Sequence, residues 1–298
     1  MDEYENSTSL VEYNVVEAFQ FINGRRYQNS NEPIYMLPID NIEAERLRKV
    51  HCLMRLIFKG NFSSPIEEAL KSGGVKVLDI GCGSGAWIMD LSTENSSSTF
   101  VGIDMVPIFP KKCPTNAAFL QCNVLDGIPF PDATFDFVHQ RSLRLAFTLE
   151  NWKATIDDIL RVTKPGGWVE FCELDLCIRN MGPTLRKILN GATQYHAGVG
   201  VEPYVVPFLK HILAKTDKLK EIYFVETSTP FGSWGGKLGE MTFDLMVEEI
   251  QGMNPFITPI LEVTNEKFSK MIGELETESN DYETSFRYIR WFGQKKEY

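Results

Sequence analysis

The sequence has no long apolar run and no surplus of basic residues. Among its 298 residues there is no stretch of about 18 consecutive apolar residues, the shortest that spans a membrane as a helix. Its 30 Lys and Arg residues are outnumbered by 40 Asp and Glu residues, which gives a formal net charge of −10. Because an acidic surface repels phosphate backbones, these features argue against a membrane protein and against nucleic acid as a partner.

The chain also lacks the marks of secretion and of structural metal binding. Its first segment, MDEYENSTSLVEYN, is polar and acidic, without the basic stretch and apolar core of a signal peptide. The six cysteines include no C-x-x-C pair, and no histidine pair has zinc-finger spacing. We therefore expect reduced thiols, a cytoplasmic or nuclear location and no metal site.

A helix is predicted between Asp40 and Gly60. Asp40 and Glu43 form a D-x-x-E pattern, in which the aspartate accepts hydrogen bonds from the amides of the first turn. Apolar residues then recur at helical spacing, at Ile42, Leu47, Val50, Met54 and Ile57. Arg46 and His51 are five positions apart and do not share a face, so we expect only one of them to point inward.

From residue 75 onward, short apolar segments alternate with helical segments. Strands are predicted at 75–80, 99–105, 117–124, 135–140 and 167–175, with helices at 85–95 and 151–163. After residue 176 the pattern predicts helices at 183–197, 204–216 and 237–277, with strands at 221–231 and 284–295. Continuous apolar strands separated by helices are typical of a parallel sheet covered on both faces, so the expected class is α/β.

The strongest local feature is the segment VLDIGCGSG, where a predicted strand runs into Gly81, Gly83 and Gly85 and then into a helix. Glycine permits positive φ and close approach of the backbone, so a ligand can lie against the amino end of that helix. Asp104 ends the next strand, where a carboxylate accepts hydrogen bonds from ribose hydroxyls. Asp79 is a carboxylate inside a buried strand and needs a partner, such as a ligand ammonium group.

The glycine string alone leaves two other readings open. Gly81, Gly83 and Ala86 also fit G-x-G-x-x-A, the dinucleotide fingerprint. The same residues also fit a plain tight turn between a strand and a helix. The surrounding motifs and their order decide among these readings.

Four ordered motifs resemble those of the class I S-adenosylmethionine-dependent methyltransferases: VLDIGCGSG, VGIDM, PFPDATFDFVH and LRVTKPGGWVEF. A closer resemblance, to the fungal LaeA-like and UMTA-like group, is carried by EPIYMLPIDNIEAERLRKVH and PFGSWGGKLGEM. The resemblance implies a Rossmann-like sheet of seven strands in the order 3-2-1-4-5-7-6, with the last strand antiparallel, and a helical cap. It also implies S-adenosyl-L-methionine as the cofactor.

With this fold, we expect a polar tail at 1–32 and one methyltransferase domain at 33–298. The parts of the domain are an N-terminal helical cap at 33–72, a cofactor-binding core at 73–175, helical cap inserts at 176–218 and 235–280, and last strands at 219–234 and 282–296.

The resemblance also implies a set of cofactor contacts. Asp79 supports the amino end of the cofactor, the three glycines shape the turn beneath it, and Asp104 takes the ribose diol. Asn123 stands where the family usually has an acidic residue for the adenine amine; alternatively, it caps its own turn. The full set of candidates is Tyr35, Asp79, Gly81, Gly83, Gly85, Asp104, Met105, Asn123, Val124, Leu125 and His139.

Two residues are candidates for catalysis. His139 lies at the end of the fourth core strand, and imidazole suits proton removal near neutral pH. The alternative is an orienting or packing histidine. Glu173, on the fifth strand, binds a substrate hydroxyl or ammonium group, or it pairs with a neighbouring basic residue. Arg141 fits a structural or carboxylate-orienting role better than a catalytic one.

Missing motifs narrow the acceptor. The fourth strand is followed by HQRS instead of N-P-P-[YFW], and there is no P-C-Q loop, which disfavours methylation of nucleic-acid bases. We expect a small hydroxyl- or carboxyl-bearing acceptor and an O-methyltransferase of secondary metabolism. The alternatives are a LaeA-like regulatory or protein methyltransferase in a nuclear complex, with a protein partner, and a non-catalytic cofactor-binding scaffold. Aromatic and Met side chains of the cap are candidates for an acceptor pocket: Phe208, Phe231, Trp234, Met241, Phe243 and Phe256.

Overall fold

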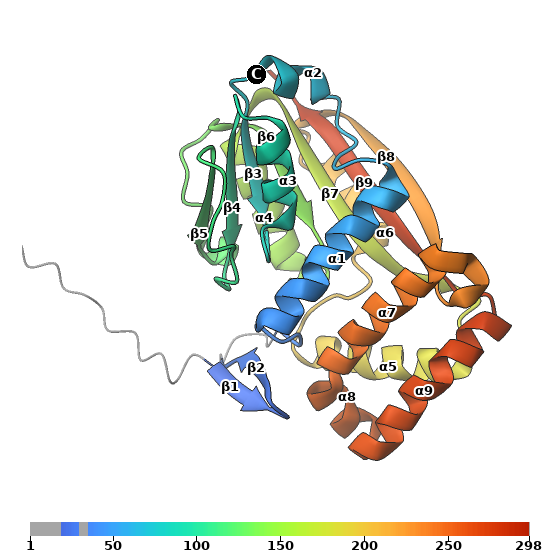
Figure 1. Cartoon of the computed structure of the whole chain (residues 1–298). Coiled ribbons are helices and arrows are strands. Elements are labelled where there is room, and N and C mark those ends of the chain that lie inside the picture. The colour runs from blue at the N-terminus through green and yellow to red at the C-terminus, as the bar shows by residue number, and fades with distance from the viewer. Residues whose placement is uncertain (1–18, 30–34, 298) are drawn as a thin grey trace, which may run out of the picture.

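The computed structural model describes residues 19–29 and 35–297. Most of the predicted polar tail, residues 1–32, therefore lies outside the described residues. The described part is a twisted sheet with helices on both faces, and a group of helices gathers below one end of the sheet (Figure 1).

Two short strands lie within the range predicted as a polar tail. β1 (Phe19–Ile22) and β2 (Arg25–Gln28) pair antiparallel as a hairpin. Tyr27 of β2 is 1% exposed, and its hydroxyl donates to the carbonyl oxygen of Gly252 at 2.8 Å. This part of the amino-terminal segment is folded against the body of the protein.

The central sheet has seven strands in the order β5-β4-β3-β6-β7-β9-β8. Its strands are β3 (Lys76–Ile80), β4 (Thr99–Asp104), β5 (Ala117–Gln121), β6 (Phe135–Arg141), β7 (Thr163–Arg179), β8 (Leu219–Pro230) and β9 (Ser285–Lys295). The pairs from β5 to β7 are parallel, and β9 runs antiparallel to both of its neighbours. Counted within this sheet, the order is 3-2-1-4-5-7-6, so the predicted α/β fold and strand order are confirmed.

The predicted helices are present as well, with the segment 237–277 divided into three. The helices are α1 (Asn41–Phe58), α2 (Glu67–Ser72), α3 (Ala86–Glu94), α4 (Leu149–Val162), α5 (Pro183–Gly198), α6 (Val206–Lys215), α7 (Gly236–Gly252), α8 (Asn254–Leu261) and α9 (Asn265–Asp281), with short 3-10 turns η1 (Val124–Asp126) and η2 (Ser233–Gly235).

Because side chains alternate in direction along each strand, the hydrophobic core lies on both faces of the sheet. Val138 of β6 packs in the cluster that includes Trp152 and Ile156 of α4. The preceding residue, Phe137, packs on the opposite face with Trp87 of α3. Since side chains alternate along a strand, His139 is directed to the same face as Phe137, beneath α3.

Helix α1 begins as predicted, and Val50, Met54 and Ile57 of its predicted apolar face are packed in the core, but charged residues are buried as well. The side chain of Asp40 caps it by accepting from the amide of Glu43 at 3.0 Å. Ile42, predicted on the apolar face, is 62% exposed, whereas Glu43, Arg46 and His51 are buried. The predicted inward face was therefore wrong in part.

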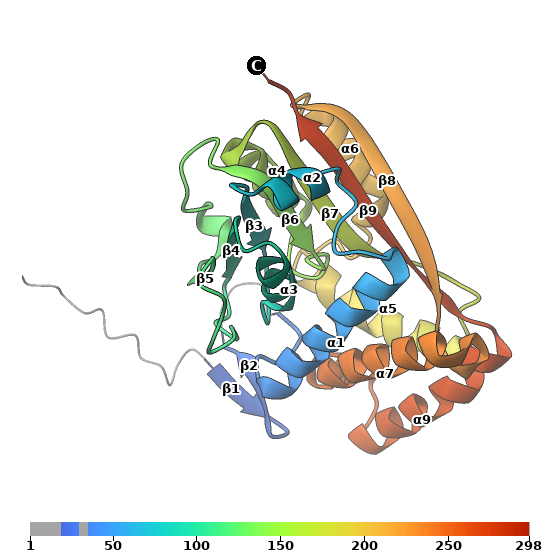
Figure 2. The same cartoon turned by 45° about the horizontal axis from the view of Figure 1, so that its top comes forward.

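The position of α1 explains this difference. It crosses the front of the molecule between α3 and α7 (Figure 2), so that it has two covered sides. Arg46 lies 3.0 Å from Glu249 of α7, and His51 lies 2.9 Å from Asp90 of α3. The expectation that only one of Arg46 and His51 points inward was wrong, because it assumed a single covered side.

The turn before α3 offers a test of packing. Gly85 has φ 71, and a Cβ there would lie 2.5 Å from the Phe119 ring, whereas Gly74 has φ 79 and open space around it. A non-glycine residue at positive φ costs roughly 1–2 kcal/mol and an overpacked site roughly 1–3 kcal/mol. We expect Gly85→Ala to lower the free energy of unfolding in urea by about 2–5 kcal/mol and Gly74→Ala by about 1–2 kcal/mol. Equal losses would mean that Phe119 moves aside freely.

Candidate active site

A cavity of about 600 Å³ opens at the carboxyl ends of β3, β4 and β6. Its size falls in the range of small-molecule sites, which is about 300–1,000 Å³. The structure brings most of the predicted cofactor residues to its wall: Tyr35, Gly81, Gly83, Asp104, Met105, Asn123, Val124 and Leu125. Three other predicted residues, Asp79, Gly85 and His139, do not line it.

The glycine turn after β3 is covered closely from two sides. Gly81 and Gly83 have φ 66 and φ 53, a conformation that favours glycine. A Cβ on Gly81 would lie 2.7 Å from Leu143, in the loop after β6, and a Cβ on Gly83 would lie 3.1 Å from Leu47 of α1. The turn therefore needs glycine both for its backbone and for the space that its neighbours leave.

Asp104 is fixed at the cavity wall by backbone amides. One carboxylate oxygen accepts from the amide of Gly83 at 2.8 Å, and the other accepts from the amide of Val106 at 2.9 Å. Burial raises the pKa of Asp104 to about 6, and the backbone hydrogen bonds partly oppose that shift. Each oxygen keeps a lone pair, so the side chain can accept hydroxyl hydrogens from a ligand in the cavity.

The end of β5 supplies a mixed wall. The Asn123 side-chain oxygen accepts from the amide of Leu125 at 3.1 Å, so it caps the 3-10 turn η1. This is the turn-capping role that the sequence left open for Asn123. Val124 and Leu125 add apolar surface beside it. The wall thus offers one amide and two apolar side chains to a flat ligand.

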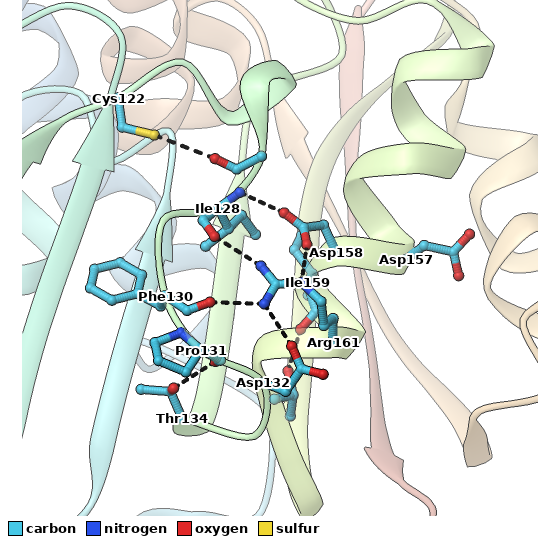
Figure 3. A network of polar contacts seen from close by, with 12 residues as sticks. Cys122, Ile128, Phe130, Pro131, Asp132, Thr134, Asp157, Asp158, Ile159 and Arg161 are labelled. Carbon is cyan, nitrogen blue, oxygen red and sulfur yellow. Dashed lines mark hydrogen bonds and ion pairs between the residues drawn. The ribbon is translucent and has the colours of Figure 1, made fainter.

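Arg161 of α4 holds the loop that continues from this wall. It donates to the carbonyl oxygens of Ile128 and Phe130, both at 2.8 Å, and to the carboxylate of Asp132 at 2.9 Å (Figure 3). Asp158 on the same helix accepts from the amide of Ile128. The conformation of the loop between η1 and β6 is therefore set by α4.

Asp79 and His139 form a buried pair behind the cavity. They are register partners on β3 and β6, and His139 Nδ1 lies 2.8 Å from Asp79 Oδ1. The imidazole stacks on the Trp87 indole, with centroids 4.1 Å apart and an interplanar angle of 7°. His139 is 1% exposed, and its Nε2 has no hydrogen-bond partner among the described residues. The carboxylate thus orients the ring, but the ring lies in the layer beneath α3.

Glu173 is also placed behind the wall. It accepts from Gln140 Nε2 at 2.6 Å, from the amide of Leu143 at 2.7 Å and from the amide of Arg144 at 3.3 Å. Burial raises its pKa, and these hydrogen bonds oppose the shift. Glu173 therefore holds the turn after β6, where Ser142 has φ 61. Its partners are an amide side chain and the backbone, where the sequence suggested a basic residue.

A buried charged cluster that reaches the cavity through Glu43 was missed from the sequence. Arg46 donates to Glu43 at 2.6 Å and to Glu249 at 3.0 Å, and Arg144 lies 3.5 Å from Glu249. Glu43, which also lines the cavity, was recognised only as part of a capping pattern. Glu43 and Arg46 are three residues apart on one helix, a spacing that places their side chains side by side and could have predicted this ion pair.

The side chains proposed for an acceptor pocket lie elsewhere. None of the six cap residues predicted to form that pocket lines the cavity; they are Phe208, Phe231, Trp234, Met241, Phe243 and Phe256. Phe231 is fully buried against Phe243 and Phe286, with ring centroids 4.9 Å and 5.0 Å away, whereas Phe208 and Trp234 are 49% and 41% exposed. They belong to the core beneath the sheet or to the surface.

Residues 19–29 and 35–297 contain no group of three or more His, Cys, Asp or Glu side chains that could hold a metal ion. No helix in these ranges has both the length and the apolar character that crossing a membrane requires.

Comparison with known proteins gives related methyltransferases. Residues 77–167 match the methyltransferase domain family. The chain is 27% identical over 208 residues to methyltransferase str2 of Strobilurus tenacellus, covering 68% of this chain and 73% of str2. It is 32% identical over 162 residues to the secondary metabolism regulator laeA of Coprinopsis cinerea, covering 52% of this chain and 39% of laeA. It is 30% identical over 164 residues to methyltransferase pytC of Aspergillus terreus, covering 53% and 47%.

The matched part of this chain thus spans about half or less of laeA and pytC. Among solved structures, phosphoethanolamine N-methyltransferase 2 of Haemonchus contortus, in complex with phosphomonomethylethanolamine and S-adenosylhomocysteine, aligns with a TM-score of 0.50. The alignment covers 88% of this chain and 60% of that one at 14% identity, so it supports the fold alone.

Proposed function

We propose that this chain, which belongs to the class I S-adenosylmethionine-dependent methyltransferases and is similar to the fungal LaeA-like group, is an O-methyltransferase of secondary metabolism. Its acceptor would be a small molecule with a hydroxyl or carboxyl group. The observation that carries the proposal is a single covered cavity that joins the glycine turn, Asp104 and an apolar wall. Such a site suits a cofactor with a small acceptor beside it.

The residues of the cavity fit the cofactor. Asp104 would accept from the two ribose hydroxyls while its backbone partners hold it in place. Val124 and Leu125 would face the adenine, and the methionine part would lie against the backbone of Gly81 and Gly83, which line the cavity. When bound, S-adenosylmethionine supplies a methyl group on a sulfonium sulfur.

The acceptor would lie beyond the glycine turn, along the segment after β6. There Leu143, Ala146 and Phe147 line the cavity with apolar side chains, and α1 covers it through Leu47. These side chains would exclude water and align the acceptor, which contributes a large part of the rate of a displacement reaction. A carboxylate acceptor carries no proton to remove at neutral pH, so alignment alone would serve it.

A second candidate function is a regulatory or protein methyltransferase. The similarity to proteins named secondary metabolism regulators favours it. So does the edge strand β8, on which Tyr223, Phe224 and Val225 are each between 42% and 53% exposed. A partner protein would cover such a stretch, whereas a metabolite enzyme would act alone. Methyl transfer by the purified chain to small phenols and carboxylic acids, followed with a labelled donor, separates the two.

Cofactor identity has its own test. We expect calorimetry to give micromolar dissociation constants for S-adenosylmethionine and S-adenosylhomocysteine, and no comparable binding of NAD. The reason is the ordered set of motifs and the residues that they bring to the cavity. Tight binding of NAD together with no signal for S-adenosylmethionine would contradict the proposed function.

A further inference from the structure

Arg141 is a cation at the cavity wall without an acidic partner. It is the last residue of β6, it lines the cavity, and no carboxylate within 19–29 and 35–297 lies within ion-pair distance of it. From this juxtaposition we infer that Arg141 binds a carboxylate group of a ligand in the cavity. The inference rests on the proposed function and assigns one ligand group within the same site.

The other inward arginines have partners. Arg46 lies 3.0 Å from Glu249, and Arg290 lies 3.6 Å from Glu170. Arg141 instead has a guanidinium whose pKa is lowered, chiefly by burial. The carboxylates of Asp79 and Glu173 favour its charged form from beyond ion-pair distance, but no carboxylate in the described part of the chain bonds to the guanidinium directly. A ligand carboxylate in the cavity would do so through up to two parallel hydrogen bonds.

Two residues position the guanidinium. His51 Nδ1 lies 3.5 Å from Arg141 Nη1, and His51 Nε2 lies 2.9 Å from Asp90 Oδ2. Burial, together with the positive charge of Arg141, lowers the pKa of His51 to about 4. The neutral ring therefore donates from Nε2 to Asp90 and presents the lone pair of Nδ1 to Arg141. His51 and Asp90 are positioning residues in this arrangement.

The carboxylate has two possible sources at this place. One is the amino-acid part of the cofactor, and the other is the acceptor. Both would lie near the carboxyl end of β6, so the chemistry of recognition is shared. The two sources differ in which ligand loses affinity when the guanidinium is removed.

The first arm of the test compares two adenosine ligands by calorimetry. S-adenosylhomocysteine carries the carboxylate, whereas 5′-methylthioadenosine lacks the amino-acid group. If Arg141 binds the cofactor, Arg141→Met weakens the binding of S-adenosylhomocysteine by about 10- to 100-fold and leaves the binding of 5′-methylthioadenosine unchanged. Arg48→Met, which removes an exposed guanidinium of α1, is the matched control and should change neither.

The second arm uses the protein saturated with S-adenosylhomocysteine. If Arg141 binds the acceptor, benzoate, cinnamate or hexanoate raises the melting temperature of the parent and not that of Arg141→Met, and cofactor affinity is unchanged. The inference is overturned when a folded Arg141→Met protein matches the parent in both arms. Arg141→Lys serves if the Met variant does not fold. It should show a smaller loss than the Met variant, because lysine keeps the positive charge but lacks the planar fork.

Binding of 5′-methylthioadenosine by both proteins keeps this inference separate from the proposed function. Failure of the parent to bind either adenosine ligand would overturn the proposed function and the inference with it. His51→Leu tests the positioning role. His51→Leu should weaken the binding of whichever carboxylate-bearing ligand the two arms identify, and should leave the binding of 5′-methylthioadenosine unchanged. If His51 were purely structural, the substitution would weaken the binding of both ligands.

Discussion

Asp104→Ala should weaken the binding of S-adenosylhomocysteine about a hundredfold or more. The variant loses two charge-assisted hydrogen bonds to the ribose hydroxyls, each worth about 1.5–3 kcal/mol. Calorimetry with the folded variant measures this loss directly. Asp126→Ala is a suitable control, because it removes another carboxylate that lines the same cavity, and it should have little effect. Retained affinity in Asp104→Ala would mean that the ribose site lies elsewhere.

The same residue predicts a pH dependence. Burial raises the pKa of Asp104 to about 6, above its ordinary value of 3.8, so the folded protein without ligand holds that proton more tightly than the unfolded chain does. The stability contributed by this group is therefore present at low pH and is lost as the pH rises through about 6. Ligand affinity should change in the opposite sense, because the ionised carboxylate accepts the hydroxyl hydrogens. Weaker binding at pH 7.5 than at pH 5.5 would contradict this.

His139→Ala is expected to lower the free energy of unfolding by about 3–5 kcal/mol. The substitution leaves the buried carboxylate of Asp79 without its partner and removes the ring that stacks on Trp87. His139→Asn is the matched control, since its amide nitrogen takes roughly the place of Nδ1 and should restore most of the loss. Urea unfolding of the free protein measures both.

The outcome also decides the catalytic role. A general base would give a different result: parent-like stability and cofactor affinity in His139→Ala, with turnover of an acceptor reduced by about a hundred- to ten-thousandfold. The structure favours the first result, because the ring is enclosed beneath α3 and does not line the cavity.

The succession of strands and helices along the chain was predictable from local signals, whereas the spatial order of the strands in the sheet came from the family resemblance. Apolar runs, glycine turns and helical spacing each belong to a few neighbouring residues, and they located every strand of the central sheet. The position of Asp104 at the cavity wall was predictable for the same reason, since a carboxylate at the end of a strand beside a glycine turn is a local feature.

What could not be predicted depends on which element covers a side chain. His139 lies at a strand end, but only the alternation of β6 together with the position of α3 directs it away from the cavity. Arg46 and His51 are both buried because α1 has neighbours on two sides. Glu173 was predicted to bind a substrate hydroxyl or ammonium group or to pair with a neighbouring basic residue. In the structure it accepts hydrogen bonds from the backbone amides of Leu143 and Arg144, because the chain turns back over it after β6.

Because α1 supplies part of the cavity wall, ligand affinity depends on this helix being packed in place. Leu47 and Glu43 line the cavity, so a complete site exists only while α1 is docked. Its contacts with α3 and α7 include charged pairs, and Ile42 and Leu56 remain exposed. If a distant change left α1 docked in about a tenth of the molecules, the apparent dissociation constant would rise about tenfold without any altered ligand contact. A substitution that loosens α1 would therefore lower ligand affinity even though it touches no ligand contact.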